Sequence, residues 1–180
     1  CFGGSDGALD LNPGGGVPPY SYLWNTGDTL QDMDSLTFGN YAIQVTDDNG
    51  CIEEQTFLVD QPAEPVTIAD TSGNISCFGG NDGFIDITVT GGNGGYTFDW
   101  SNAALTEDLT DLFIGVYIVE VEDSKGCFAS DTIELTEPLA PLSLTTEMTA
   151  VLCFGEANGI ASVEASGGTA PYSSLWSNAE

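Results

Sequence analysis

The sequence predicts an all-β fold, namely tandem immunoglobulin-like antiparallel β-sandwich domains in a linear array. Three observations carry this prediction: a regular internal repeat, apolar and polar residues that alternate along short segments, and one tryptophan per copy in an apolar strand. Alternation with a period of two is the pattern of a strand that buries one face. Six or seven short strands in about 76 residues, with turns between them, are typical of an immunoglobulin-type sandwich.

The internal repeat has a period of 76 residues, and no insertion or deletion interrupts it. Residues of one type recur at this step, namely Cys1, Cys77 and Cys153, Cys51 and Cys127, Trp24, Trp100 and Trp176, and Tyr20, Tyr96 and Tyr172. Proline-bearing joints at 61–65 and 137–141 suit short, stiff connectors. We therefore predict repeat 1 at residues 1–62, lacking its first strand, a complete repeat 2 at residues 63–138, and a truncated repeat 3 at residues 139–180.

The strands of the second copy are expected at residues 66–69, 83–90, 96–100 and 117–122, with one more after Cys127. We expect their inward side chains to be Ile85, Ile87, Val89, Trp100, Tyr117, Val119, Val121, Ile133 and Leu135. Sugar stacking is the alternative role for the aromatic residues, but their register with apolar strand positions favours core packing. Tyr41 and Tyr117 resemble the tyrosine corner, in which the ring packs inward and the hydroxyl ties down a loop.

The composition excludes several classes of function. The chain has 28 acidic residues, one basic residue (Lys125) and no histidine, for a net charge of −27. Phosphate binding needs clustered lysine and arginine, and an anionic membrane would repel this surface, so we expect no nucleic-acid partner and no direct membrane insertion. Without histidine there is no Ser-His-Asp or Cys-His machinery and no histidine-ligated metal. We expect no catalytic residues and hence no enzyme.

Calcium is the one cofactor that the acidic residues of this sequence are suited to bind. Carboxylates at loop ends are the oxygen ligands that calcium prefers, and the candidates are Asp6, Asp47, Asp48, Asp82 and Asp123. No EF-hand-like spacing is present. The third copy has Asn158 where the second has Asp82, which argues against an essential metal site there. Solvation of a long extracellular array is therefore the favoured role of the charge.

Two cysteines per unit, in so acidic a chain, predict an oxidising compartment and disulfide bonds. We expect pairing within copies, Cys1–Cys51 and Cys77–Cys127, with the partner of Cys153 outside the chain. One geometric objection stands, because the first strand and a hairpin turn place the two cysteines of a copy at opposite poles of a sandwich. Staggered pairing between neighbouring copies, as Cys1 with Cys127, and free thiols therefore stay open.

The unit resembles the SprB repeat of large surface adhesins from gliding Bacteroidetes. In the second copy the resemblance lies in the Cys-Phe-Gly-Gly-Asn-Asp-Gly segment 77–83, Gly91-Gly92, Tyr96, Trp100, the Gly-Val-Tyr segment 115–117, Gly126-Cys127 and the Thr-Glu-Pro segment 136–138. The first copy carries corresponding motifs from Cys1 to Pro62, and the third departs at Glu156 and Asn158. The resemblance covers the entire chain.

This resemblance implies an immunoglobulin-like or PKD-like fold, export by the type IX secretion system, an extracellular location on the bacterial outer surface, and a role in adhesion or gliding motility. It also implies O-glycosylation, because the same lineage carries glycans at Asp-Ser/Thr-apolar triplets. This chain has three such triplets, with acceptors at Thr29, Ser35 and Thr132.

We therefore expect a spacer or stalk in a secreted adhesin or filament, in which each copy adds length and the prolines and cross-links add stiffness. A carbohydrate-binding repeat that holds polysaccharide through exposed loops is the alternative. The expected partners are neighbouring repeats of the same long chain. Surface polysaccharide, or like chains in a filament, also stay open.

Overall fold

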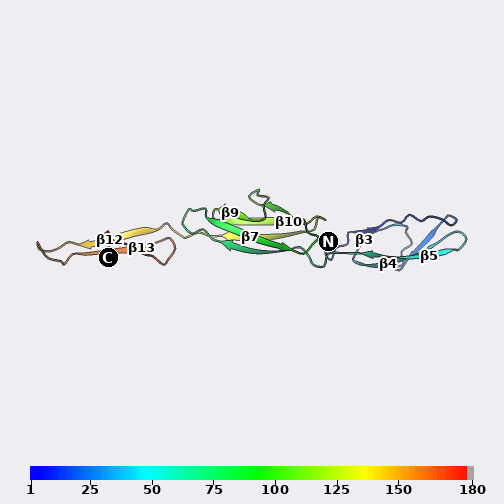
Figure 1. Cartoon of the computed structure of the whole chain (residues 1–180), viewed down its shortest axis with the longest axis horizontal. Helices are drawn as coiled ribbons and strands as arrows, with labels where there is room; N and C mark the ends of the chain where they lie inside the picture. Colours follow the sequence, from blue (N-terminus) through cyan, green and yellow to red (C-terminus); the bar gives the residue numbers. More distant parts are fainter. Residues whose placement is uncertain (178–180) are drawn as a thin grey trace. The chain divides into compact units, whose positions relative to one another are not determined.

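The computed structural model of the chain describes residues 1–177, and these residues form thirteen strands and no helix (Figure 1). The first copy contains β1 (Gly7–Leu9), β2 (Ser21–Trp24), β3 (Met33–Leu36), β4 (Gly39–Thr46) and β5 (Ile52–Val59). The second contains β6 (Thr67–Gly73), β7 (Gly83–Thr90), β8 (Thr97–Trp100), β9 (Leu109–Leu112), β10 (Gly115–Glu122) and β11 (Phe128–Leu135). The third contains β12 (Ser143–Thr149) and β13 (Ile160–Ser166).

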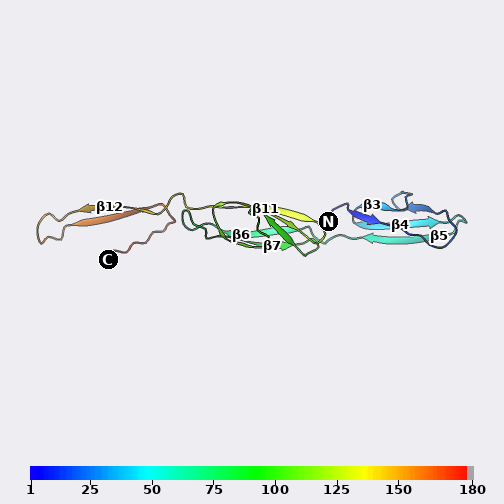
Figure 2. The ribbon, with the colours of Figure 1, turned by 90° about the horizontal axis from the view of Figure 1, so that it is seen from above.

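The strands of each of the first two copies form two sheets. In the second copy one sheet has the order β6-β7-β9 and the other β8-β10-β11, and the first copy repeats this arrangement with β1-β3 and β2-β4-β5. In Figure 1 the label of β3 lies on the opposite side of the first copy from β4 and β5, and Figure 2 shows the same strands turned by 90°. The predicted all-β, immunoglobulin-like sandwich class is confirmed.

The core lies where the period-two pattern places it. In β7 and β10 burial alternates along the strand: Ile85, Ile87, Val119 and Val121 are buried, with Ile85 and Val119 fully inaccessible to solvent, whereas the predicted inward residues Val89 and Tyr117 are half-buried. The tryptophans at the ends of β2 and β8 are each 2% exposed, and the indole Nε1 of Trp100 donates a hydrogen bond to the carbonyl of Thr106 at 2.8 Å. Trp24 donates in the same way to Leu30 at 2.8 Å. The second-copy tryptophan is therefore a core residue, as predicted, and so is its first-copy counterpart.

The tyrosine corner is present in both copies. The hydroxyl of Tyr41 donates to the carbonyl of Thr37 at 3.0 Å, and that of Tyr117 donates to the carbonyl of Phe113 at 3.1 Å. Each bond ties the start of β4 or β10 to the turn four residues earlier, as the sequence predicts.

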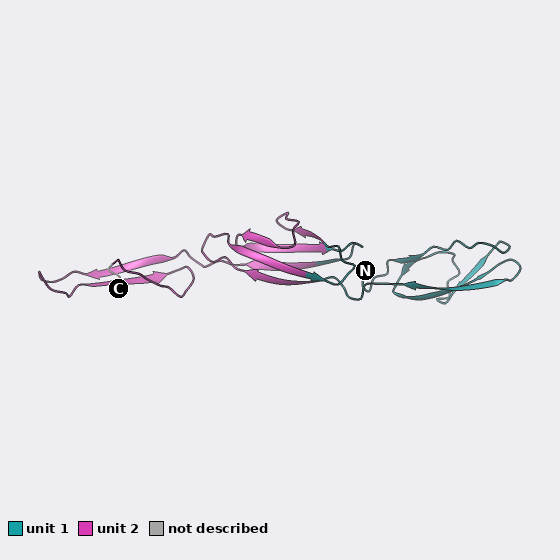
Figure 3. Ribbon diagram, viewed as in Figure 1, with its two compact units in different colours: residues 1–67, 89–96, 122–129 teal, residues 68–88, 97–121, 130–180 magenta. Residues whose placement is uncertain are grey.

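The chain divides into two compact units (Figure 3). Unit 1 contains residues 1–67, 89–96 and 122–129, and unit 2 contains residues 68–88, 97–121 and 130–180. Unit 1 thus combines the first copy with the linker and two loops of the second copy. The domain borders expected after residues 62 and 138 stay a prediction.

Candidate functional site at the repeat junction

A disulfide bond joins Cys1 of the first copy to Cys127 of the second, and both residues belong to unit 1. Their Cα atoms lie 5.3 Å apart, within the range that a bridge requires. This is the staggered pairing, so the expected pairs Cys1–Cys51 and Cys77–Cys127 are wrong. Among residues 1–177, Cys51, Cys77 and Cys153 are exposed and unpaired.

The length of β5 explains why pairing within a copy fails. Cys51 immediately precedes β5 (Ile52–Val59), whereas the turn that carries Cys1 is fastened just beyond its far end, since the Gly3 amide donates to Gln61 Oε1 at 2.9 Å. Eight residues of strand span about 26 Å. Two cysteines whose Cα atoms lie more than about 7 Å apart cannot be bridged.

The turn that carries Cys1 is fixed by two hydrogen bonds. The Gly4 amide donates to the Cys1 carbonyl at 3.0 Å, and the bond from Gly3 to Gln61 anchors the turn to the linker. Sequence reasoning missed the role of Gln61. A signal was available, because Gln61 and its counterpart Glu137 both place a side-chain oxygen acceptor one residue before a proline.

Asp123 holds the loop that carries Cys127, and its side chain is 4% exposed. Its Oδ1 atom accepts from the amides of Lys125 at 2.8 Å and Cys127 at 3.1 Å, and its Oδ2 atom accepts from the amide and side-chain nitrogens of Asn93 at 2.7 and 2.8 Å. Burial raises the pKa of the Asp123 carboxyl, but hydrogen bonds from Asn93, Lys125 and Cys127 outweigh burial and lower the pKa to about 2. The carboxylate is therefore ionised at neutral pH and organises the loop.

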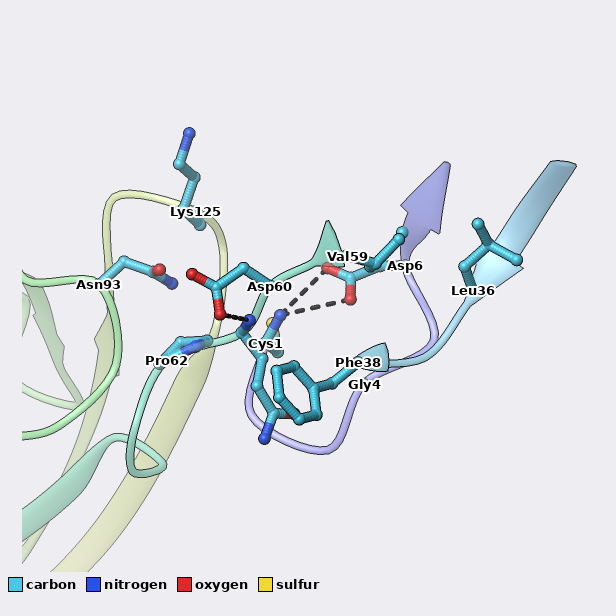
Figure 4. A pocket seen from close by; sticks show the side chains of 12 residues that line it. Cys1, Gly4, Asp6, Leu36, Phe38, Val59, Asp60, Pro62, Asn93 and Lys125 are labelled. Carbon is cyan, nitrogen blue, oxygen red and sulfur yellow. Dashed lines mark hydrogen bonds and ion pairs between the residues drawn. The ribbon is translucent and has the colours of Figure 1, made fainter. Parts of the chain in front are cut away.

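A shallow pocket of about 530 Å³ lies beside the disulfide within unit 1. Cys1, Asp6, Phe38 and Val59 line it from the first copy, while Asn93 and Lys125 lie on loops of the second copy (Figure 4). The side chain of Lys125 points away from Cys1 (Figure 4). The lining of the pocket therefore combines carboxylate, apolar and amide side chains with Lys125 beside the disulfide.

Backbone contacts hold the linker against the glycine turn of the second copy. The Gly92 amide donates to the Glu64 carbonyl at 2.9 Å. A Cβ atom on Gly91, whose φ is +79°, would collide with the Pro65 carbonyl oxygen. Glycine is required at this position both by the positive φ and by the close approach of the linker.

The calcium candidates close loops within their own copies. The Asp82 carboxylate accepts hydrogen bonds from the hydroxyl of Ser76 and from its amide at 3.0 Å, and the first of these contributes most to lowering the pKa of Asp82. In the third copy Asn158 Oδ1 accepts from the Leu152 amide at 3.1 Å. A neutral amide oxygen thus serves at the position of Asp82, which explains why the third copy tolerates asparagine there.

The remaining calcium candidates lie in the first copy. In this chain the terminal ammonium of Cys1 lies 3.2 Å from Asp6 Oδ2, and the Asp47 carboxylate accepts from the amides of Val17, Asn49 and Cys51 at 2.8–3.0 Å. Asp48 is exposed beside it. Within residues 1–177 no three His, Cys, Asp or Glu side chains form a group that could hold a metal ion.

The three glycosylation candidates are accessible. Thr29, Ser35 and Thr132 are all exposed, and the backbone amide of Thr132 donates to the side chain of Asp131 at 2.7 Å. The Ser35 hydroxyl donates to the Asp34 carboxylate at 3.1 Å. Their modification stays a prediction.

The family model of the SprB repeat matches residues 1–29, 69–105 and 145–180, which together exceed half of the chain. The chain therefore belongs to the SprB repeat family. Repeats of this family occur in cell-surface adhesins and are typically structural, non-enzymatic modules, so membership implies an adhesin repeat region at the cell surface.

Two further comparisons accompany this match. No curated protein matches the chain. An amphioxus IgVJ-C2 molecule, a solved structure, is similar over 74% of this chain and 97% of its own, with 13% identity and a TM-score of 0.34. The part of the chain that the structure describes contains no helix long and apolar enough to cross a membrane.

Proposed function

We propose that this chain is a spacer segment of a secreted bacterial cell-surface adhesin or filament, and that it supports adhesion or gliding motility by carrying another part of the protein away from the cell. The observation that supports this proposal most is the bond between Cys1 and Cys127, because it joins one copy covalently to the next. A covalent joint between repeats suits a spacer, whose task is to hold another part of the protein at a distance from the cell. Export by the type IX system and O-glycans on the exposed acceptors belong to the same proposal.

The acidic surface has a defined role in this proposal. A net charge of −27 makes neighbouring chains repel one another, which keeps long arrays separate and soluble. The partners of each copy are then the copies before and after it. The loops therefore need no ligand, metal or cofactor.

Direct binding of polysaccharide is the competing function, and one experiment separates the two. The purified 180-residue chain is applied to an array of bacterial and algal polysaccharides, and small-angle scattering is recorded on the same sample. A spacer gives no retention and a maximum dimension that does not change with protein concentration. Saturable retention in the micromolar range, lost when an exposed aromatic such as Phe128 is changed to alanine, would establish the binding function instead.

A further inference from the structure

We propose that disulfide bonds link neighbouring repeats throughout an array of these units. Each early cysteine (Cys1, Cys77 or Cys153) then bonds to the late cysteine (Cys51 or Cys127, or the residue at that position) of the repeat that follows. The partner of Cys77 is the late cysteine of a following third repeat, and the partner of Cys51 is an early cysteine of a preceding repeat. The way in which repeats are joined does not depend on what the array does.

The turn of the early cysteine has the same geometry in every copy. The amide three residues after the cysteine donates to its carbonyl in Cys1, Cys77 and Cys153, at 3.0, 2.9 and 3.2 Å. The anchor to the linker also recurs, since the Gly79 amide donates to Glu137 Oε2 at 2.6 Å as Gly3 donates to Gln61. Cys77 is therefore presented as Cys1 is.

The loop of the late cysteine also recurs. The Asp47 carboxylate accepts from the Cys51 amide at 2.8 Å, as Asp123 accepts from that of Cys127 at 3.1 Å. The two loops differ in exposure, because Cys127 is 7% exposed in its bond to Cys1 whereas Cys51 is exposed. Cys51 therefore lies in a loop held in the same way as that of Cys127, but it is exposed to solvent.

The third copy already lies beside Cys77 within unit 2. Thr169, which occupies the position of Asn93, donates from its hydroxyl to the carbonyl of Ser76 at 3.0 Å. In the second copy, the Asn93 side-chain nitrogen lies 3.7 Å from the sulfur of Cys127. In the second copy, the loop of Asn93 lies beside the late cysteine Cys127. The corresponding loop of the third copy, which carries Thr169, therefore contacts Ser76, the residue before Cys77.

The linker contact recurs at this second joint. The Gly168 amide donates to the Ala140 carbonyl at 2.8 Å, 76 residues on from the bond between Gly92 and Glu64. A Cβ on Gly167 would collide with the Pro141 carbonyl oxygen. A complete third copy held in this way brings its late cysteine to Cys77.

Formation of each link is a two-electron oxidation. The two thiols lose two protons and two electrons to a small-molecule disulfide, which leaves as two thiols, while one S–S bond forms between the repeats. This oxidant class is available in oxidising compartments, where structural disulfides form and persist.

The test extends the present chain at its C-terminus with a second copy of residues 105–138, which completes the third repeat in step and adds one late cysteine. The oxidised protein is alkylated, digested at its acidic residues without reduction, and mapped by mass spectrometry. We expect the added cysteine to be linked to Cys77, the bond between Cys1 and Cys127 to persist, and Cys51 and Cys153 to be alkylated. A link from the added cysteine to Cys153, a link from Cys77 to Cys127, or an alkylated Cys77 overturns the proposal.

A matched variant tests the same pairing without relying on how much of the linked peptide is recovered. In the extended chain, Cys77→Ser removes the proposed partner, so the added cysteine becomes fully alkylated. If bonds formed within copies, the added cysteine would stay linked to Cys153 in this variant, and the proposal would fail.

Discussion

The Oδ1 atom of Asp123 accepts a hydrogen bond from the amide of Cys127 at 3.1 Å, so one carboxylate holds both the hairpin loop and one end of the link between copies. Its Oδ2 atom is directed to Asn93 on the neighbouring loop. Loop shape and cross-link position therefore depend on the same side chain.

Replacing Asp123 by asparagine should lower the melting temperature of the oxidised chain. Asparagine offers one acceptor oxygen, and its NH₂ group would face N–H donors at the other position. Asp48→Asn is the matched control, because it makes the same charge change at an exposed residue and should leave the melting temperature nearly unchanged. Equal melting temperatures for the two variants would contradict the assigned role of Asp123.

The contribution of Asp123 should depend on pH in a defined direction. Its folded pKa of about 2 lies below the ordinary value of 3.8, so its stabilisation is complete above that value and is lost as pH falls toward 2. The difference in stability between the wild type and Asp123→Asn should therefore be constant from pH 7 to about 5 and shrink between about pH 4 and 2. Urea denaturation of both proteins at each pH measures it, and a difference that grows on acidification would refute the assignment.

Two glycines at matching positions should respond differently to the same substitution in the 180-residue chain, in which the linker residues that face Gly91 have no counterpart beside Gly15. Gly15 and Gly91 both have positive φ, at +82° and +79°, but a Cβ atom meets nothing within 4 Å at Gly15 and collides with Pro65 at Gly91. Gly15→Ala should cost about 1–2 kcal/mol of unfolding free energy, the penalty of the left-handed conformation alone. Gly91→Ala should cost clearly more, as measured by urea denaturation. Similar costs would mean that the linker does not depend on this close approach.

Removal of calcium should leave stability unchanged. The oxygens of Asp47, Asp82 and Asp123 already accept hydrogen bonds that close their own loops. We expect the same melting temperature in a calcium chelator and in millimolar calcium, with magnesium as the control for ionic strength. A rise in melting temperature specific to calcium would establish a calcium site.

Cutting the linker should not separate the two copies. A protease recognition sequence placed between Ala63 and Glu64 leaves Cys1 and Cys127 on opposite sides of the cut. The cleaved protein should therefore migrate as one species on a non-reducing gel and as two after reduction. In the Cys127→Ser control, the fragments should separate without reductant. Separation of the wild type without reductant would instead indicate pairing within copies.

The sequence predicted most of the sandwich because alternation reports burial directly. Ile85, Ile87, Val119 and Val121 are all buried as the period of two requires. Neither β9 nor its first-copy counterpart β3 was among the strands placed from the sequence. In β9, Leu109 and Leu112 are both buried although they lie three residues apart, because Asp111 has a φ of 57° and the register with β7 shifts there.

The junction could be predicted only in part. The cysteines, the glycine pair and the proline linker were visible as repeated residues. Their connectivity was not, because spacing along the chain does not say which ends of successive sandwiches meet. What decided it was the length of β5 and the side-chain bond of Gln61 beyond its far end.

The bond between Cys1 and Cys127 also governs how this segment responds to tension. When the chain is pulled at Cys1 and beyond Cys127, the force crosses the sulfur–sulfur bond, and the backbone between them carries none of it. The bond spans 126 positions, so unfolding under force releases about 430 Å less contour length than the reduced chain would. Under tension this segment therefore lengthens only in backbone that lies outside the loop closed by Cys1 and Cys127.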